Sequence, residues 1–251
     1  MLAVFDSGLG GLSILHSIRK VYQGEVIYLG DTSRAPYGNR SDSEITSFTK
    51  ELLFFTKECG ATHFVGACNS ISMQMTETIL ESVGIKNNEY TDMVRATKEY
   101  CDPSDISSLL ILATAATIRS EIYDDVFSNV HFVESLALPL LAGAIERGDD
   151  DDIATALAPL YYDITIPSHI FLGCTHFPFL KDKMQKLFSE ACFVDPAIFV
   201  KQKVREWNLP EELHNNKTTY FLSKESEIFK RKVFELGLDQ NAEFVRESFV
   251  Y

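Results

Sequence analysis

Short apolar runs alternate with longer amphipathic segments along the chain. The short runs are rich in Val, Ile, Leu and Phe and predict buried strands at Leu2–Phe5, Val26–Leu29, Phe64–Ala67, Leu109–Ala113, Val130–Val133, Ile170–Gly173 and Thr219–Leu222. Apolar residues at helical spacing predict helices at Leu12–Val21, Ser43–Cys59, Met73–Val83, Leu138–Arg147, Leu180–Glu190 and Glu225–Leu236. Strands separated by helices indicate an α/β fold with mainly parallel sheets.

Three strand-and-loop units occur twice in the same order. The units that begin at Leu2, Val26 and His63 match those that begin at Leu110, Val130 and His169, with Pro36 and Pro139 after the second pair, at offsets between 103 and 108 residues. This repeat predicts two similar α/β halves whose loops at the strand ends face each other. We expect a discontinuous first domain, 1–91 plus 207–251, and a second domain, 92–206, with a linker near Asn87-Asn88.

Composition narrows the class of protein. The chain has 251 residues, 45% of them hydrophobic, and a formal net charge of −13, which argues against binding nucleic acid but not against an acidic substrate in a pocket with local donors. A run of about 20 apolar residues, as a membrane span requires, is missing, and so is a signal peptide. The five cysteines are widely spaced without a CxxC motif, so we expect reduced thiols in the cytoplasm, with neither a disulfide framework nor a zinc site.

Two cysteines share a context that suggests chemistry. Cys68 and Cys174 each follow a predicted strand and precede polar donors, Asn69-Ser70 and Thr175-His176. A thiol has an unperturbed pKa of about 8.5, so a modest local shift makes it reactive near neutral pH. Two thiols in one cleft could act as nucleophile and resolver, or as base and acid, and racemisation needs the second arrangement. We interpret the other cysteines, Cys59, Cys101 and Cys192, as structural.

Two turn sequences add weaker signals. Asp6–Ser13 is glycine-rich and lies between a predicted strand and helix, where it allows a ligand close approach and the helix N-terminus favours a carboxylate. It is not a dinucleotide fingerprint, because Ser13 stands where that motif needs glycine. Pro36-Tyr37-Gly38 is an ordinary turn when it is read alone. The acidic run Asp149–Asp152 is typical of a solvated helix start rather than a metal site.

Four blocks together resemble the glutamate racemases of the aspartate/glutamate racemase superfamily. In the family's order they are Asp6–Gly11, Asp31-Thr32 with Pro36-Tyr37-Gly38, Ala67-Cys68-Asn69 and Gly173-Cys174-Thr175-His176. The resemblance implies a cofactor-independent isomerase, without pyridoxal phosphate or metal, that interconverts L- and D-glutamate and supplies D-glutamate for peptidoglycan synthesis. It also implies two pseudo-symmetric α/β domains with the active site in the cleft between them, and a homodimer.

The resemblance also implies a role for each matching position. Cys68 would be the base for D-glutamate and Cys174 the base for L-glutamate, with Asp6 assisting the first and His176 and Glu146 the second. The substrate's amino and carboxylate groups would be held by Asp6, Ser7, Tyr37, Gly38, Asn69, Ser70, Thr114, Thr117, Thr175 and His176.

Three departures from the family pattern concern substrate affinity and selectivity. Ser70 stands where threonine is usual, Leu138-Pro139 stands where a Cys-Pro pair is frequent, and the segment 113–117 lacks a glycine. A preference for aspartate or another small acid therefore stays open. Two other hypotheses also stay open: acyl transfer with Cys174 as nucleophile and His176 as base, and an amino-acid binding module without activity.

Overall fold

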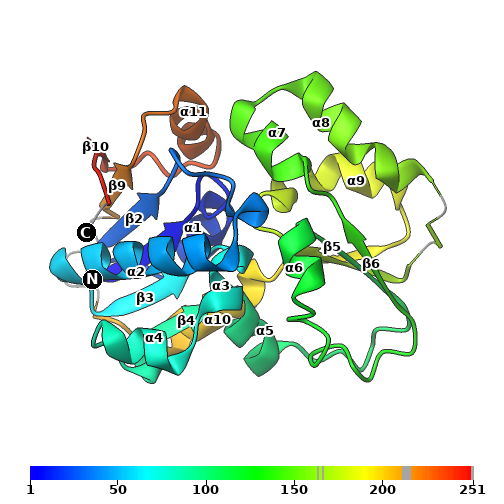
Figure 1. The fold of residues 1–251 in the computed structure, drawn as a ribbon, viewed down its shortest axis with the longest axis horizontal. Coiled ribbons are helices and arrows are strands. Elements are labelled where there is room, and N and C mark those ends of the chain that lie inside the picture. Colours follow the sequence, from blue (N-terminus) through cyan, green and yellow to red (C-terminus); the bar gives the residue numbers. More distant parts are fainter. Residues whose placement is uncertain (163, 166, 211–215, 250–251) are drawn as a thin grey trace.

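Two parallel sheets form the framework of the chain (Figure 1). The computed structural model describes residues 1–162, 164–165, 167–210 and 216–249. The first sheet has the order β10-β9-β2-β1-β3-β4 and consists of β1 (Leu2–Asp6), β2 (Val26–Gly30), β3 (His63–Gly66), β4 (Tyr90–Asp92), β9 (Thr218–Leu222) and β10 (Ala242–Arg246). The second has the order β6-β5-β7-β8 and consists of β5 (Leu109–Ala113), β6 (Val133–Ala137), β7 (His169–Gly173) and β8 (Cys192–Val194). Every strand pairing among the described residues is parallel. The predicted fold class is confirmed.

The two sheets repeat one topology. The order β2-β1-β3-β4 in the first sheet recurs as β6-β5-β7-β8 in the second. The register recurs as well: Leu2 pairs with Val26 and His63, and Leu109 pairs with Val133 and His169. Because parallel strands end at one edge of a sheet, each half carries the loops after its strands on a single edge.

Helices cover both faces of the first sheet. The helices that the structure describes in both halves are α1 (Leu12–Ile18), α2 (Asp42–Glu58), α3 (Asn69–Gln74), α4 (Glu77–Ser82), α5 (Met93–Tyr100), α6 (Ala115–Arg119), α7 (Leu141–Arg147), α8 (Asp150–Leu157), α9 (Lys181–Leu187), α10 (Ala197–Glu206) and α11 (Glu227–Glu235). Alternate residues of β1 point to opposite faces, so Leu2 and Val4 pack with α1, α10 and α11, while Ala3 and Phe5 pack with α2, α3 and α4. No helix in the described part of the chain is long and apolar enough to cross a membrane.

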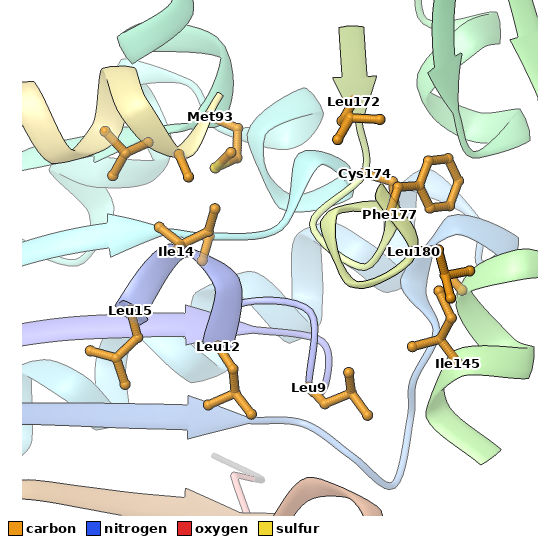
Figure 2. Packing of buried hydrophobic residues seen from close by; sticks show 14 of the residues in the cluster. Leu9, Leu12, Ile14, Leu15, Met93, Ile145, Leu172, Cys174, Phe177 and Leu180 are labelled. Carbon is orange, nitrogen blue, oxygen red and sulfur yellow. The ribbon is translucent and has the colours of Figure 1, made fainter. Parts of the chain in front are cut away.

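One apolar cluster runs through both halves. Leu9, in the loop after β1, belongs to the same buried cluster as Ile145, Phe177 and Leu180 of the second half (Figure 2). In the second half this cluster also packs α7, α8 and α9 against one face of the sheet. The apolar contact between the halves holds the two strand-end edges against each other.

Two predicted elements are wrong. The predicted strand Val130–Val133 is displaced, because Val130 closes a turn on Phe127 and packs in a buried cluster, and β6 begins only at Val133. The predicted helix Met73–Val83 is broken into α3 and α4 at Thr76, whose side chain caps α4 by accepting the N–H of Ile79. The other predicted strands and helices form, with shifts at their ends.

The packing of α5 and α10, the helices at the junctions between the halves, indicates where the domains begin and end. β9 and β10 join the first sheet beside β2, so the C-terminal segment returns to the first half, although 211–215 and 250–251 lie outside the described residues. α5 and α10 pack on each other, α5 also packs on α3, and α10 on α1. Both helices lie within the range 92–206 of the predicted second domain. Their packing favours a second domain that begins after Tyr100 and ends before Ala197, which we propose in place of the predicted limits.

Candidate active site

Loops from both halves enclose one small cavity. Its lining residues are Ser7, Pro36, Tyr37, Gly38, Cys68, Asn69 and Ser70 from the first half and Thr114, Ala142, Cys174, Thr175 and His176 from the second. The cavity volume is about 10 Å³, which is room for about one water molecule. In this structure the two halves are therefore closed over the site.

Cys68 occupies the first-half side of the cavity. It is the N-cap of α3, directly after the loop residue Ala67, and its side chain is buried. Its thiol donates to the hydroxyl of Ser7 over an Sγ–Oγ distance of 3.8 Å. Burial, and next the carboxylate of Asp6, raise the pKa of Cys68 to about 12. In this closed form Cys68 is a thiol at neutral pH and can give up a proton only to a strong base.

Cys174 lines the cavity from the second half and has a different partner. Its Sγ lies 3.8 Å from Nδ1 of His176, and Nε2 of that ring lies 2.7 Å from Oε1 of Glu146. Burial disfavours a charged imidazole, but the hydrogen bonds to Cys174 and Glu146 outweigh it and raise the pKa of His176 well above its ordinary value. A protonated imidazole beside a thiol favours the thiolate. Cys174 therefore lies beside a protonated ring, whereas the partner of Cys68 is a hydroxyl.

Asp6 and Glu146 lie outside the cavity lining, and each accepts a hydrogen bond from the other half of the protein. Oδ1 of Asp6 accepts the N–H of Gly8 at 2.8 Å, and Oδ2 accepts the hydroxyl of Thr175 from the other half at 3.1 Å. Glu146 makes the reverse connection, because its Oε1 accepts the N–H of Leu9 at 2.7 Å. Burial also raises the pKa of Asp6. Neither carboxylate is among the cavity-lining residues, so each acts through a neighbour.

The other predicted site residues gather as expected, with one exception. Ser7, Tyr37, Gly38, Asn69, Ser70, Thr114, Thr175 and His176 all line the cavity. Thr117 does not. Its hydroxyl lies 3.0 Å from Oγ1 of Thr114, which also accepts the N–H of Thr117 at the start of α6. Thr117 therefore supports Thr114 instead of facing the cavity.

Several residues at the site were not predicted to be catalytic or to bind substrate. Pro36 and Ala142 line the cavity, and Pro36 belongs to the turn that supplies Tyr37. The phenol of Tyr37 donates to Oδ2 of Asp31, a fully buried carboxylate whose Oδ1 accepts the hydroxyl of Ser223 at 2.8 Å. Asp31 was visible in the sequence only as part of a family block, and its link to Tyr37 depends on the folded turn.

Two glycines of the loop after β1 allow the halves to meet. A Cβ on Gly8 would lie 1.9 Å from Oε1 of Glu146, and one on Gly10 would lie 2.4 Å from Oγ1 of Thr175 and 2.5 Å from Nδ1 of His176. The glycine-rich turn is therefore needed for close approach between the halves. Its close partners are the groups that surround Cys174.

Several known glutamate racemases are similar to this chain in sequence and in structure. A glutamate racemase of Campylobacter jejuni is 31% identical over 238 residues, 91% of this chain and 94% of the relative. One of Helicobacter acinonychis is 34% identical over 202 residues, 75% of this chain and 76% of the relative. A crystal structure of glutamate racemase from C. jejuni has a TM-score of 0.82 at 28% identity, over 95% of this chain and 98% of that one. No protein-family model matches the chain.

Proposed function

The chain belongs to the glutamate racemase family, and from this premise we propose that Cys68 and Cys174 are the two bases that interconvert L- and D-glutamate on opposite faces of Cα. The observation that carries the proposal is that both thiols line one cavity, each at the start of the loop after a matched strand, β3 or β7. The pseudo-symmetric framework delivers one thiol from each half, as a reaction with two faces requires.

Each turnover moves two different protons, one from Cα to one cysteine and one from the other cysteine to Cα. In the direction from L to D, the thiolate of Cys174 takes the Cα proton and the thiol of Cys68 gives its own proton to the opposite face. The turnover leaves Cys174 as a thiol and Cys68 as a thiolate, so the reverse reaction uses the same groups with exchanged roles. A protonated His176 stabilises the starting thiolate on Cys174. Ser7 is within reach of the Cys68 sulfur for the same purpose.

The difficult part of the reaction is the negative charge that develops on the substrate. A Cα–H of an amino acid is a much weaker acid than a thiol, so the site must stabilise this charge with fixed donors. Asn69, Ser70 and Thr175 line the cavity and carry such donors. Enclosure by both halves excludes water, which strengthens each of these interactions.

The substrate requires the halves to separate before it binds. The closed cavity holds about one water, so glutamate cannot enter this conformation. Separation breaks the contacts of Thr175 with Asp6 and of Leu9 with Glu146, and the bond from the Ser13 hydroxyl to the carbonyl of Thr175 at 3.0 Å. These bonds re-form when the halves close over the substrate. Closure thereby restores the carboxylates of Asp6 and Glu146 to the contacts between the halves that they make here.

A second candidate function is acyl transfer, for one specific reason. Cys174, His176 and Glu146 are hydrogen-bonded in the order nucleophile, base and orienting carboxylate. This scheme gives Cys68 no task, although Cys68 lines the same cavity. Mass spectrometry of a trapped acyl-enzyme on Cys174 would support it, whereas two-base racemisation forms no covalent intermediate.

The wider setting follows from the family resemblance. We propose that D-glutamate made by this enzyme supplies peptidoglycan synthesis, that the enzyme works in the cytoplasm, and that it forms a homodimer. The preference for glutamate over aspartate is tested by comparing turnover of the two amino acids, because they differ by one methylene in the side chain.

Proton exchange with solvent tests the mechanism directly. The protein is incubated with L-glutamate or D-glutamate in heavy water, and deuterium at Cα is followed by NMR while the enantiomers are separated by chiral chromatography. We expect deuterium in the product from either enantiomer. The matched control is the double variant Cys68→Ser/Cys174→Ser, which should exchange nothing. If wild-type protein puts no deuterium at Cα, the racemase mechanism is wrong.

A further inference from the structure

Tyr123 and Asn69 come from different halves and meet beside the cavity. Asn69 is the first residue of α3 in the first half, and Tyr123 lies in the turns after α6 in the second. The hydroxyl of Tyr123 donates a hydrogen bond to Oδ1 of Asn69. Both residues are buried, with 2% and 3% of their surfaces exposed, but only Asn69 lines the cavity.

The other amide atom of Asn69 is left without a partner. Nδ2 is buried, and no hydrogen-bond acceptor for it lies among the described residues. Buried amide groups are almost always hydrogen-bonded, because an unpaired donor loses its interaction with water and receives nothing in return. With Oδ1 occupied by Tyr123, Nδ2 is the amide atom free to serve a ligand in the cavity. A carboxylate oxygen is the acceptor that an N–H donor binds most strongly.

The position of the Tyr123 hydroxyl is determined by packing in the second half. The ring packs edge-on against Phe171 of β7, with centroids 4.6 Å apart, and belongs to a buried cluster with Phe127. Burial raises the pKa of Tyr123 well above its ordinary value, so the hydroxyl keeps its proton throughout the neutral range. It is therefore a donor with a set position, and an oxygen is its natural partner on Asn69.

We propose that Tyr123 is a positioning residue, which holds Oδ1 of Asn69 and thereby turns Nδ2 toward the carboxylate of the amino-acid substrate. The inference rests on the proposed function, which supplies that carboxylate. Because the two residues belong to different halves, their hydrogen bond exists only when the halves are closed. Closure therefore completes a substrate-binding donor as well as excluding water.

A double-mutant cycle tests this role. Tyr123→Phe removes the hydroxyl and keeps the ring on Phe171, so we expect kcat/KM for L-glutamate to fall about tenfold, the equivalent of about 1.4 kcal/mol. Asn69→Ala removes the donor itself, and kcat/KM should fall further. In the double variant, Tyr123→Phe should have no additional effect, because Tyr123 acts through Asn69. A purely structural role for Tyr123 predicts instead that the two losses multiply, and that result overturns the proposal.

Asn69→Asp tests the direction of the amide. This variant keeps an oxygen for Tyr123 but places a second carboxylate oxygen where Nδ2 stood, so repulsion should raise KM above that of Asn69→Ala. An equal or smaller KM contradicts the orientation that we infer. This comparison does not depend on the folding of Tyr123→Phe, and thermal denaturation of each variant shows which of them are folded.

Tyr220→Phe is the matched control. It removes another buried phenol, which donates to the carbonyl of Leu238 at 2.9 Å and does not line the cavity, so kcat/KM should be unchanged. Failure of the inference and failure of the proposed function are distinguishable. Wild-type protein that does not racemise glutamate removes the function, whereas active wild-type protein matched by Tyr123→Phe removes only the role of Tyr123.

Discussion

Glu146 accepts a hydrogen bond from Nε2 of His176 at 2.7 Å, and through that imidazole it acts on the sulfur of Cys174. The same carboxylate oxygen accepts the N–H of Leu9 from the other half of the protein. Glu146 therefore links the protonation of His176 to the contact between the halves, although it lies outside the cavity lining.

Replacement of Glu146 by glutamine should shift the pH dependence of activity. In the wild type the pKa of His176 is raised, so His176 stays protonated through neutral pH and kcat/KM should fall only well above pH 6.5. Glutamine removes the negative charge, so the folded pKa of His176 drops and the falling limb should move to lower pH. The measurement is kcat/KM against pH for both proteins. Superimposable falling limbs would show that Glu146 does not control His176.

The contact between His176 and Glu146 should make the free energy of unfolding depend on pH. A pKa raised on folding contributes stability that is fully present below the unfolded value of about 6.5 and is lost as pH rises through the folded value. The free energy of unfolding of wild-type protein, from denaturant titration, should therefore exceed that of Glu146→Gln most clearly between about pH 5 and 6.5. We expect the difference to shrink at higher pH, and a difference that grows with pH contradicts the assignment.

Single replacements of the two cysteines should remove most racemisation but not all proton exchange. Cys68→Ser and Cys174→Ser should each lower racemisation by about 100-fold to 10,000-fold, the usual contribution of one acid–base group. Each variant should retain exchange of the Cα proton of one enantiomer, through the thiol that remains. NMR in heavy water with each pure enantiomer measures this exchange. Cys192→Ser is the control, because Cys192 is exposed and does not line the cavity. Full racemisation by either active-site variant overturns the two-base mechanism.

The two active-site thiols should differ in reactivity. Burial and the carboxylate of Asp6 raise the pKa of Cys68 to about 12, whereas Cys174 lies beside His176, whose raised pKa keeps it protonated. Since the thiolate is the reactive form, iodoacetamide near pH 7 should alkylate Cys174 faster than Cys68. Both sulfurs are buried, so alkylation of either requires the halves to open and access affects them alike. Opening leaves Asp6 with Cys68 in the first half and His176 with Cys174 in the second, so the difference in neighbours persists. Peptide mass spectrometry measures the two rates, and faster modification of Cys68 contradicts the assignment of the resting proton.

Gly8→Ala should disrupt the contact between the halves. The new methyl group would lie 1.9 Å from Oε1 of Glu146, which is held by Leu9 and His176. We expect a loss of stability of about 1–3 kcal/mol, typical of overpacking, together with a fall in kcat/KM as Glu146 is displaced. Chemical denaturation and steady-state kinetics measure the two effects.

Gly143→Ala is the control for that variant. Gly143 lies in α7, the helix that carries Glu146, and a Cβ there would come no closer than 3.3 Å to the flexible end of Arg147. Alanine in a helix interior should preserve or slightly raise stability. If Gly8→Ala, unlike this control, loses stability but keeps its full kcat/KM, the contact between Glu146 and His176 is not needed for activity.

Much of the framework could be predicted from the sequence because it is repetitive. The buried parallel strands carry continuous apolar runs, and matching runs precede both Cys68 and Cys174, so their common place at the strand ends follows from the order of the chain. The strands β4, β8 and β10 were not predicted. β4 and β8 have only three residues each, and β10 is an edge strand of five residues that includes Glu243 and Arg246, so their patterns are too weak to detect.

What could not be predicted depends on contacts between distant segments. Tyr123 reaches Asn69 across the two halves, and no local pattern around position 123 marks it as part of a site. Asp31 holds Tyr37 only because the chain turns back on itself between them. Thr117 was predicted to bind substrate, but its hydroxyl is turned to Thr114 at the start of a short helix, a rotation that residue type alone does not specify.

The unlike surroundings of Cys68 and Cys174 have a thermodynamic consequence. L- and D-glutamate are mirror images with identical free energies in water, so at equilibrium they are present in equal amounts. The second-order rate constants of the two directions must then be equal, whatever groups stand behind each sulfur. An imidazole on one side and a hydroxyl on the other can change only how each direction divides its barrier between binding and turnover. The two halves of the protein are therefore free to diverge in sequence. The mirror symmetry of the substrates still keeps kcat/KM equal for L-glutamate and D-glutamate.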